Sequence, residues 1–427
     1  MKVRQICMMV LFGLGVIPAM QAQTFDKLWK EVEQAEKKSL PKTVIKLTDE
    51  IYQKGEKERN SAQMLKAYMW RMKTQDILTP DSFYVGLRDL EQWAKQTEQP
   101  MDRAILHSLI AEFYANYAAD NQWQLRQRTE IVGETPSADI REWTANMFVE
   151  KVRTNVKEAL ADSLLLLKTS SRNYIPFVEL GETSEYYHHD MYHLLASRAV
   201  RALNQIERLE CGSFNGITVS PVKQDIINIY ERMSDAYETA GLKEGYVLTM
   251  LQYLEWERGN DNKLQPVQLK KGLGEWTADT YNAALDELKR QFKSEPICAE
   301  VYLAQARYAV EKMQQVNALQ LCDEAIRLYP GYRRINALKN LREEILAPFL
   351  NVSAVSQAFP NEEIKLNVGH KNLDGFTVRL YQAKKLVKEQ HYSVLRPKDY
   401  RAKDTVFTFK APDLGTYVMR IIPDSRA

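Results

Sequence analysis

The chain has 427 residues, of which 45% are hydrophobic and 27% are charged. This composition argues against an intrinsically disordered chain, and the length leaves room for two or three domains. The 58 basic and 56 acidic residues give a formal charge of +2, so the chain has no long-range field to attract nucleic acid or anionic lipid.

The first 22 residues carry the pattern of a secretory signal peptide. Lys2 and Arg4 precede an apolar run over 6–17, and a short stretch ending in the small residue Ala22 follows. The alternative is a membrane anchor, but the run is well short of the ~20 residues that span a bilayer. We therefore expect export to the periplasm or cell surface, with no membrane span in the mature chain.

Residues 23–346 are predicted to be helical almost throughout. The first segment places apolar side chains at steps of three and four residues, which is typical of an amphipathic helix: Phe25, Leu28, Trp29 and Val32. Pro41 opens a second segment of the same kind, and a third begins near Met64. Short polar turns between short helices predict stacked hairpins.

Further along, Asp81-Ser82 and Pro100-Met101-Asp102 are residues that commonly begin helices, and they predict two more. The apolar pattern then predicts a long helical segment over 139–167 and another over 190–209.

A tetratricopeptide-like repeat is predicted over 299–332. Six residues fall at the defining places of a repeat of about 34 residues: Tyr302, Ala306, Ala318, Cys322, Ala325 and Pro330. A weaker second unit is predicted over about 227–260, where the bulky Tyr246 replaces the usual small residue. Small residues at these places let the two helices of a hairpin approach closely.

The apolar period changes from helical to two after Pro348. Alternation over 364–368, 376–380, 406–409 and 417–421, separated by turn-forming residues, predicts several short strands. Strands with turns at this spacing favour a β-sandwich over 347–427. The predicted fold is thus mainly α, with stacked helical hairpins followed by one sandwich of immunoglobulin or fibronectin type.

The motifs FPNEEIKLNV at 359–368, Asn372, FTVRLY at 376–381 and PDLGTY at 412–417 resemble a macroglobulin domain. With the helical region before them, they make the chain similar to the N-terminal portion of Bacteroidetes-type alpha-2-macroglobulin family proteins.

The resemblance implies a role in protease trapping, with proteases or further macroglobulin domains as protein partners. Family members are longer and carry a bait region and often an internal thioester between a Cys and a Gln. In this sequence no cysteine opens a Cys-x-Glu-Gln run, and no bait segment is recognisable. We therefore expect a non-catalytic protein that resembles an N-terminal fragment or a truncated gene product.

Three cysteines remain after the signal peptide: Cys211, Cys298 and Cys322. Their spacing contains no CxxC pair, so it does not predict a zinc ribbon. One disulfide is possible, but buried free thiols are the favoured interpretation.

The sequence assigns no catalytic, cofactor-binding or metal-binding residue. His188, His189 and His193 have one feature of a zinc site, since His189 and His193 would share one face of a helix at i and i+4, but no third ligand is apparent nearby. Two alternatives stay open: a tetratricopeptide-type scaffold that binds another protein or a glycan, and a metal-dependent hydrolase built on these histidines.

Overall fold

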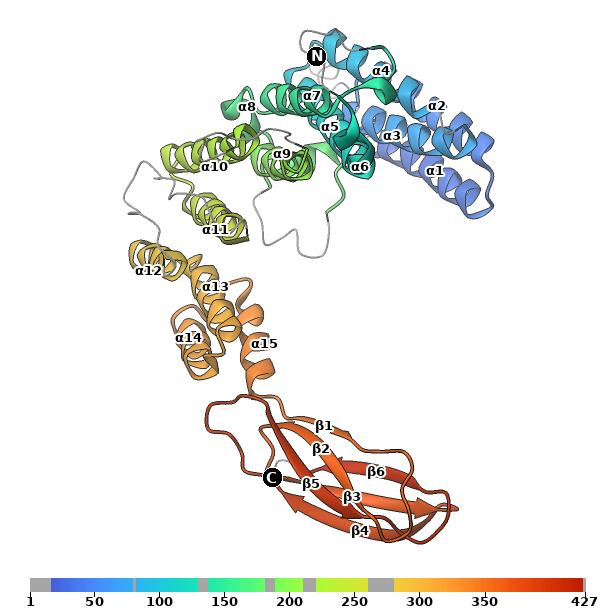
Figure 1. Cartoon of the computed structure of the whole chain (residues 1–427). Helices are drawn as coiled ribbons and strands as arrows, with labels where there is room; N and C mark the ends of the chain where they lie inside the picture. The colour runs from blue at the N-terminus through green and yellow to red at the C-terminus, as the bar shows by residue number, and fades with distance from the viewer. Residues whose placement is uncertain are drawn as a thin grey trace, which may run out of the picture. The chain divides into compact units, whose positions relative to one another are not determined.

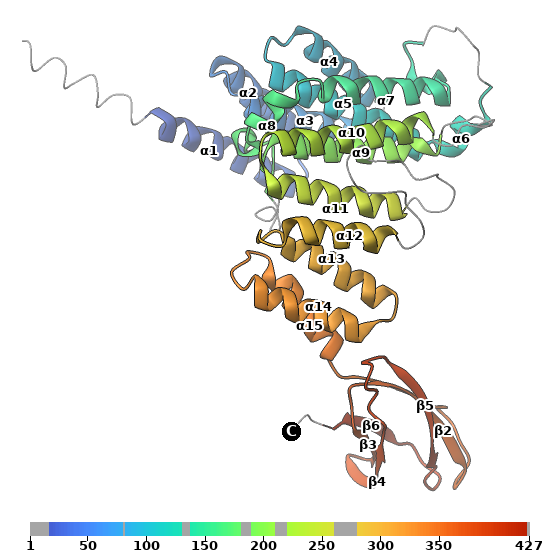
Figure 2. The same cartoon turned by 90° about the vertical axis from the view of Figure 1, so that its left-hand side faces the viewer.

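The computed structural model describes residues 17–79, 82–129, 137–180, 189–209, 220–259 and 280–424 (Figures 1 and 2). These residues form two compact units, one up to Thr249 and the other from Met250 onward. Most of the predicted signal peptide, 1–22, lies outside the described residues.

The first unit is helical. Its helices are α1 (Ile17–Lys37), α2 (Pro41–Lys57), α3 (Ser61–Leu78), α4 (Ser82–Gln96), α5 (Pro100–Asp120), α6 (Gln122–Gln127), α7 (Ala145–Ala159), α8 (Ser163–Lys168), α9 (Met191–Glu207), α10 (Pro221–Thr239) and the start of α11 (Lys243–Gly259). Two short 3₁₀ turns, η1 (Ile140–Glu142) and η2 (Ser171–Tyr174), lie between them. Proline occupies the first position of α2, α5 and α10, where its missing N–H costs the helix no hydrogen bond.

Neighbouring helices of this unit pack against one another. Helix α2 lies against α3, α5 lies against α7 and α9, and α9 lies against α10 (Figure 2). The predicted apolar stripe of the first helix is buried: Phe25, Trp29 and Val32 join a core cluster with Ile51 of α2. The indole N–H of Trp29 donates to the side-chain oxygen of Gln63 at 2.7 Å, which satisfies its one polar atom inside this core.

The long segment predicted to be helical over 139–167 is mostly helical, but it is not continuous. The structure divides it into η1, α7 and α8. The break before α8 has a local cause, because the carboxylate of Asp162 caps that helix by accepting from the backbone N–H of Leu165 at 3.0 Å. Aspartate at such a position favours starting a new helix over continuing the old one.

The second unit begins with the end of α11 and continues through α12 (Thr280–Phe292), α13 (Cys298–Glu311), α14 (Gln315–Leu328) and α15 (Ile335–Leu346). Helices α13 and α14 form the hairpin predicted over 299–332. Five of its repeat residues are at most 1% exposed: Tyr302, Ala306, Ala318, Cys322 and Ala325. Helix α14 ends two residues before Pro330, as expected for a residue that cannot donate a backbone hydrogen bond.

The weaker repeat corresponds to α10 and α11, which are joined by a turn at Gly241 with φ of +69°. The side chain of Tyr237 in α10 lies directly against Gly245 of α11, the residue before Tyr246. A Cβ atom added to Gly245 would lie 2.4 Å from Cδ1 of Tyr237. The small residue that the hairpin needs is therefore shifted by one place from the repeat pattern.

Six strands follow the helices: β1 (Phe349–Ser353), β2 (Glu363–Lys371), β3 (Gly375–Gln382), β4 (Lys385–Ser393), β5 (Lys403–Lys410) and β6 (Val418–Pro423). They form two antiparallel sheets with the orders β1-β2-β5 and β4-β3-β6, and Figure 2 shows the two layers face to face. The predicted fold class is confirmed: a mainly helical chain with hairpins is followed by a β-sandwich.

The sandwich core comes from the alternating residues that the sequence indicated. Ile364, Leu366 and Val368 of β2 and Phe376, Val378 and Leu380 of β3 meet between the sheets, each at most 9% exposed. The period of two puts every second side chain of a strand on the same face.

None of the described helices combines the length and apolarity that a membrane crossing demands.

Candidate interaction surfaces

The start of helix α9 lies between His189 and His193. Helix α9 starts at Met191, and the carboxylate of Asp190 caps it by accepting from the backbone N–H of His193 at 2.7 Å. His189 precedes the cap, and its Nε2 lies 3.1 Å from a guanidinium nitrogen of Arg172. The helical i, i+4 spacing assumed for His189 and His193 is therefore wrong, and His188 lies outside the described residues.

Two buried carboxylates link the helices of the first unit. Asp102 of α5 accepts hydrogen bonds from the Ser61 hydroxyl at 2.5 Å and from the Tyr174 hydroxyl at 2.8 Å. The hydroxyl of Tyr237 donates to the carboxylate of Asp190 and lies 3.0 Å from each of its two oxygens. Burial raises the pKa of Tyr174 and of Tyr237, and the neighbouring carboxylate, Asp102 or Asp190, raises it further. Each phenol therefore stays protonated and donates a hydrogen bond.

Within the part of the chain that the structure describes, no three His, Cys, Asp or Glu side chains gather as a metal site would require. The buried carboxylates of Asp102 and Asp190 act instead as acceptors for tyrosine and serine hydroxyls.

Cys298 and Cys322 are buried free thiols, which confirms the prediction for these two residues. Cys211 lies outside the described residues. Burial raises the pKa of both thiols, and that of Cys322 rises to about 11. A buried thiol with a raised pKa is a poor nucleophile because the thiolate is the reactive form.

We expect the native protein to resist thiol labelling. In a Cys211→Ser chain lacking residues 1–22, Ellman's reagent at pH 8 should react with Cys322 about a hundredfold more slowly than in urea, since a pKa near 11 leaves little thiolate. The rate should rise with pH as the thiolate fraction grows. Fast labelling of the folded protein would contradict the burial of these side chains.

Two hollows lie beside the helices. One, of about 440 Å³, lies between α3 and α4 and is lined by Tyr68, Arg71 and Met72 among others. The second, also of about 440 Å³, lies where α13–α15 meet the sandwich. There the side chain of Arg401 donates to the backbone oxygen of Met313 at 2.7 Å. Two of the residues that line this hollow are therefore already bonded to each other.

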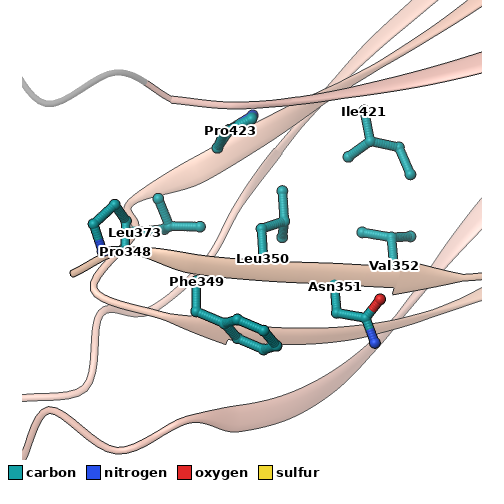
Figure 3. A pocket seen from close by; sticks show the side chains of 8 residues that line it. All are labelled: Pro348, Phe349, Leu350, Asn351, Val352, Leu373, Ile421 and Pro423. Atoms are coloured by element: carbon teal, nitrogen blue, oxygen red, sulfur yellow. The ribbon is translucent and has the colours of Figure 1, made fainter. Parts of the chain in front are cut away.

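The third hollow opens into the core of the sandwich. We call it the β1–β6 groove; it has a volume of about 280 Å³ and is lined by Pro348, Phe349, Leu350, Asn351, Val352, Leu373, Ile421 and Pro423. Figure 3 shows Leu350 and Val352 of β1 on the side of the strand that faces Ile421 and Pro423 of β6. The core-facing side chains of β1 and β6 are only partly buried, unlike those of β2 and β3.

The opposite side of the sandwich is closed. The hydroxyl of Tyr392 in β4 donates to the backbone oxygen of Thr408 in β5 at 2.8 Å, and its ring stacks on Phe376 at 5.1 Å. The ammonium of Lys388 reaches the backbone oxygen of Lys410 at 2.7 Å and lies 4.3 Å from the ring centre of Phe409. These side chains cross from one sheet to the other and cover the core on the β4–β5 side.

Sequence reasoning missed the β1 half of this groove. Leu350 and Val352 have the spacing of two that marks a strand face, but the segment directly follows a helix and is short. Their pairing with β2, in which Leu350 lies opposite His370 and Val352 opposite Val368, is what establishes the strand.

No family model matches the chain, and no curated protein matches it. The resemblance to alpha-2-macroglobulin proteins therefore depends on the sequence motifs and the order of elements.

Proposed function

We propose that the chain is an exported, non-catalytic protein-interaction protein of alpha-2-macroglobulin type. It corresponds to the N-terminal part of a protease trap, without the thioester and the bait region. The observation that carries the proposal is the sheet order β1-β2-β5 facing β4-β3-β6 behind a stack of helical hairpins. Sandwiches with this arrangement serve as interaction modules in many extracellular proteins.

The buried chemistry of the described residues supports a binding role. Asp102 and Asp190 hold tyrosine hydroxyls and helix ends together, and Cys298 and Cys322 are buried thiols with raised pKa values. These groups stabilise the fold, and none of them is placed for nucleophilic or acid–base chemistry on a substrate.

A second candidate is a tetratricopeptide-type scaffold for another protein or a glycan. The hairpin of α13 and α14 favours it, because stacked hairpins of this kind leave extended surfaces for binding. Trp123 of α6, with 74% of its surface exposed, is the large aromatic side chain that such a surface would use. The metal-dependent hydrolase gains no support, since His189 lies before α9.

Site-specific photo-crosslinking of the exported protein separates these candidates. A photoreactive residue is placed at Val418 in β6, at Trp123 in α6, or at Val387 in β4 as a control; these positions are 59%, 74% and 45% exposed. We expect adducts from Val418 whose partner is identified by mass spectrometry as an endopeptidase or a macroglobulin-type protein. Deleting residues 1–22 should keep the protein in the cytoplasm and abolish the adducts.

Adducts from Trp123 alone, with a partner of another class, would favour the scaffold and overturn the macroglobulin proposal. Retention of the complete chain in the cytoplasm would overturn the export on which both candidates depend.

A further inference from the structure

His370 lies near the end of β2, on the face of the strand that points into the sandwich core. It is 2% exposed, and its Nε2 lies 3.1 Å from the hydroxyl oxygen of Thr405 in β5. Its Nδ1 is also buried and has no hydrogen-bond partner among the described residues. A neutral imidazole suits this place, because it needs only one N–H donor and leaves the other nitrogen as a lone pair.

The nearest charges favour this neutral form. Lys403 of β5 lies directly opposite His370 in the register of the two strands, so the two side chains share one face of the sheet. Like charges at opposite positions destabilise a sheet. Burial lowers the pKa of His370, Lys403 lowers it further, and the neighbouring Asp404 raises it.

The other elements around His370 place no charged group in the core beside it. Strand β1 contains no charged residue, and the residues that β3 and β6 contribute to the core are apolar. Lys388 of β4 lies over Phe409, which is opposite the other end of β2. The remaining charged side chains at this end of the sandwich are exposed or half-buried, among them Glu343, Glu344, Lys371, Asp374, Arg401 and Asp424.

The two residues that follow this histidine in the chain hold the end of helix α15. The ammonium of Lys371 donates to the backbone oxygen of Glu344 at 2.9 Å. The amide of Asn372 donates to the backbone oxygens of Ile345 at 2.9 Å and Ala347 at 3.2 Å. The last carbonyl groups of a helix have no partner within it, so these two side chains cap α15. The imidazole and the cap belong to three consecutive residues, and a movement of one displaces the other.

We propose that His370 is a pH-sensitive switch at the joint between α15 and the sandwich. While the imidazole is neutral, it stays in the core, and Lys371 and Asn372 cap the helix. A proton on Nδ1 adds a charge and an N–H donor that meets no acceptor, opposite Lys403. Burial of such a group is costly. The protonated side chain therefore moves out to water, and the end of β2 releases α15. This device goes beyond the proposed function and does not depend on which partner the chain binds.

The closed joint is expected to weaken as the pH falls, and not as it rises. In the opened state the imidazole has its ordinary pKa of about 6.5, whereas the pKa of His370 in the closed state is lower. The opened state therefore binds more protons. The contribution of the neutral imidazole to stability is fully present above about pH 6.5 and is lost progressively as the pH falls towards the lower, closed-state pKa.

Hydrogen exchange of the purified chain, followed by mass spectrometry, measures the opening of this joint. Peptides that cover the end of α15 and the end of β2 should lose protection about threefold to tenfold between pH 7.5 and pH 5.5, after correction for the intrinsic pH dependence of exchange. Uptake of one proton with a pKa of about 6.5 sets the upper limit. A peptide from α13, in the same compact unit, is the reference and should change less than twofold.

Three variants identify the group that titrates. His370→Gln keeps an amide that can bond to Thr405 but cannot take up a proton, and it should abolish the loss of protection. Lys403→Gln removes the like charge from an exposed position and should make the loss smaller while His370 stays in place. His391→Gln changes the other histidine of the sandwich, which is exposed and pairs with Asp424, and it should leave the loss unchanged.

Protection that does not change between the two pH values, or an equal loss in His370→Gln and the unchanged protein, would overturn the proposal. A loss that disappears with His391→Gln would assign the pH dependence to that histidine and also overturn it. If His370→Gln does not fold, Lys403→Gln decides, and a loss as large as in the unchanged protein counts against the switch. An equal loss in the α13 peptide would show general unfolding in place of a local opening.

Discussion

Replacing Asp190 by alanine is expected to lower the free energy of unfolding of the first unit by about 3 kcal/mol. The change removes a helix cap, worth about 1 kcal/mol, and leaves the buried hydroxyl of Tyr237 without its carboxylate acceptor, which costs a further 1–3 kcal/mol, roughly. Asp190 is 8% exposed and Tyr237 is fully buried, so water cannot readily replace the lost acceptor.

Urea unfolding followed by tryptophan fluorescence measures this change, because five of the seven tryptophans lie in the first unit: Trp29, Trp70, Trp93, Trp123 and Trp143. Tyr237→Phe is the matched control, since it removes the hydroxyl alone and keeps the ring that packs on Gly245. It should cost about 1–2 kcal/mol. The double variant should cost less than the sum of the two, because the residues share one interaction.

Strict additivity of the two single changes would show that the Asp190–Tyr237 hydrogen bond contributes no coupling energy. A loss below about 0.5 kcal/mol for Asp190→Ala, the range of ordinary surface substitutions, would contradict the cap as well.

Replacing Asn372 by aspartate should destabilise the sandwich more than replacing it by glycine does. Asn372 is 2% exposed, and its side-chain amide donates to the backbone oxygens of Ile345 at 2.9 Å and Ala347 at 3.2 Å. It therefore joins the end of α15 to the turn between β2 and β3. Aspartate keeps the shape but turns a donor into a charged acceptor that faces two carbonyl oxygens, at a cost of about 3 kcal/mol or more.

Glycine at this position should cost only about 1–2 kcal/mol. It loses the same hydrogen bonds, but it introduces no charge, and it adopts the left-handed backbone of this residue, with φ of +54°, without strain. The sandwich contains no tryptophan, so hydrogen exchange of β2 and β3 measured by mass spectrometry is the appropriate assay. The aspartate penalty should shrink at low pH, because a protonated carboxyl regains a donor.

Asn361→Asp is the control for this pair of variants. Asn361 also has a left-handed backbone, with φ of +64°, but it is exposed, and we expect a change within about 0.5 kcal/mol. Similar losses at both positions would mean that the conformation, and not the buried amide, is what the structure requires of Asn372.

The sequence alone determined where helices give way to strands and which faces of them are buried. The three- and four-residue steps of Phe25, Trp29 and Val32 and the alternation of Ile364, Leu366 and Val368 are local patterns, and the structure buries these faces. The same holds for the repeat residues of the α13–α14 hairpin. A local period is encoded by neighbouring residues, so a single sequence is enough to reveal it.

Only the tertiary structure decided the features that depend on distant partners. Strand β4 has mostly exposed, polar residues and is a strand because of its pairing with β3. Asp190 caps the start of α9 directly after His189, and the hydroxyl of Tyr237, which is distant in sequence, donates to its carboxylate. The β1–β6 groove exists because two segments more than 60 residues apart end up as the edges of facing sheets. The alternation of apolar residues can mark each segment as a strand, but it does not show which strand lies beside it, so neither segment alone reveals that it is a sheet edge.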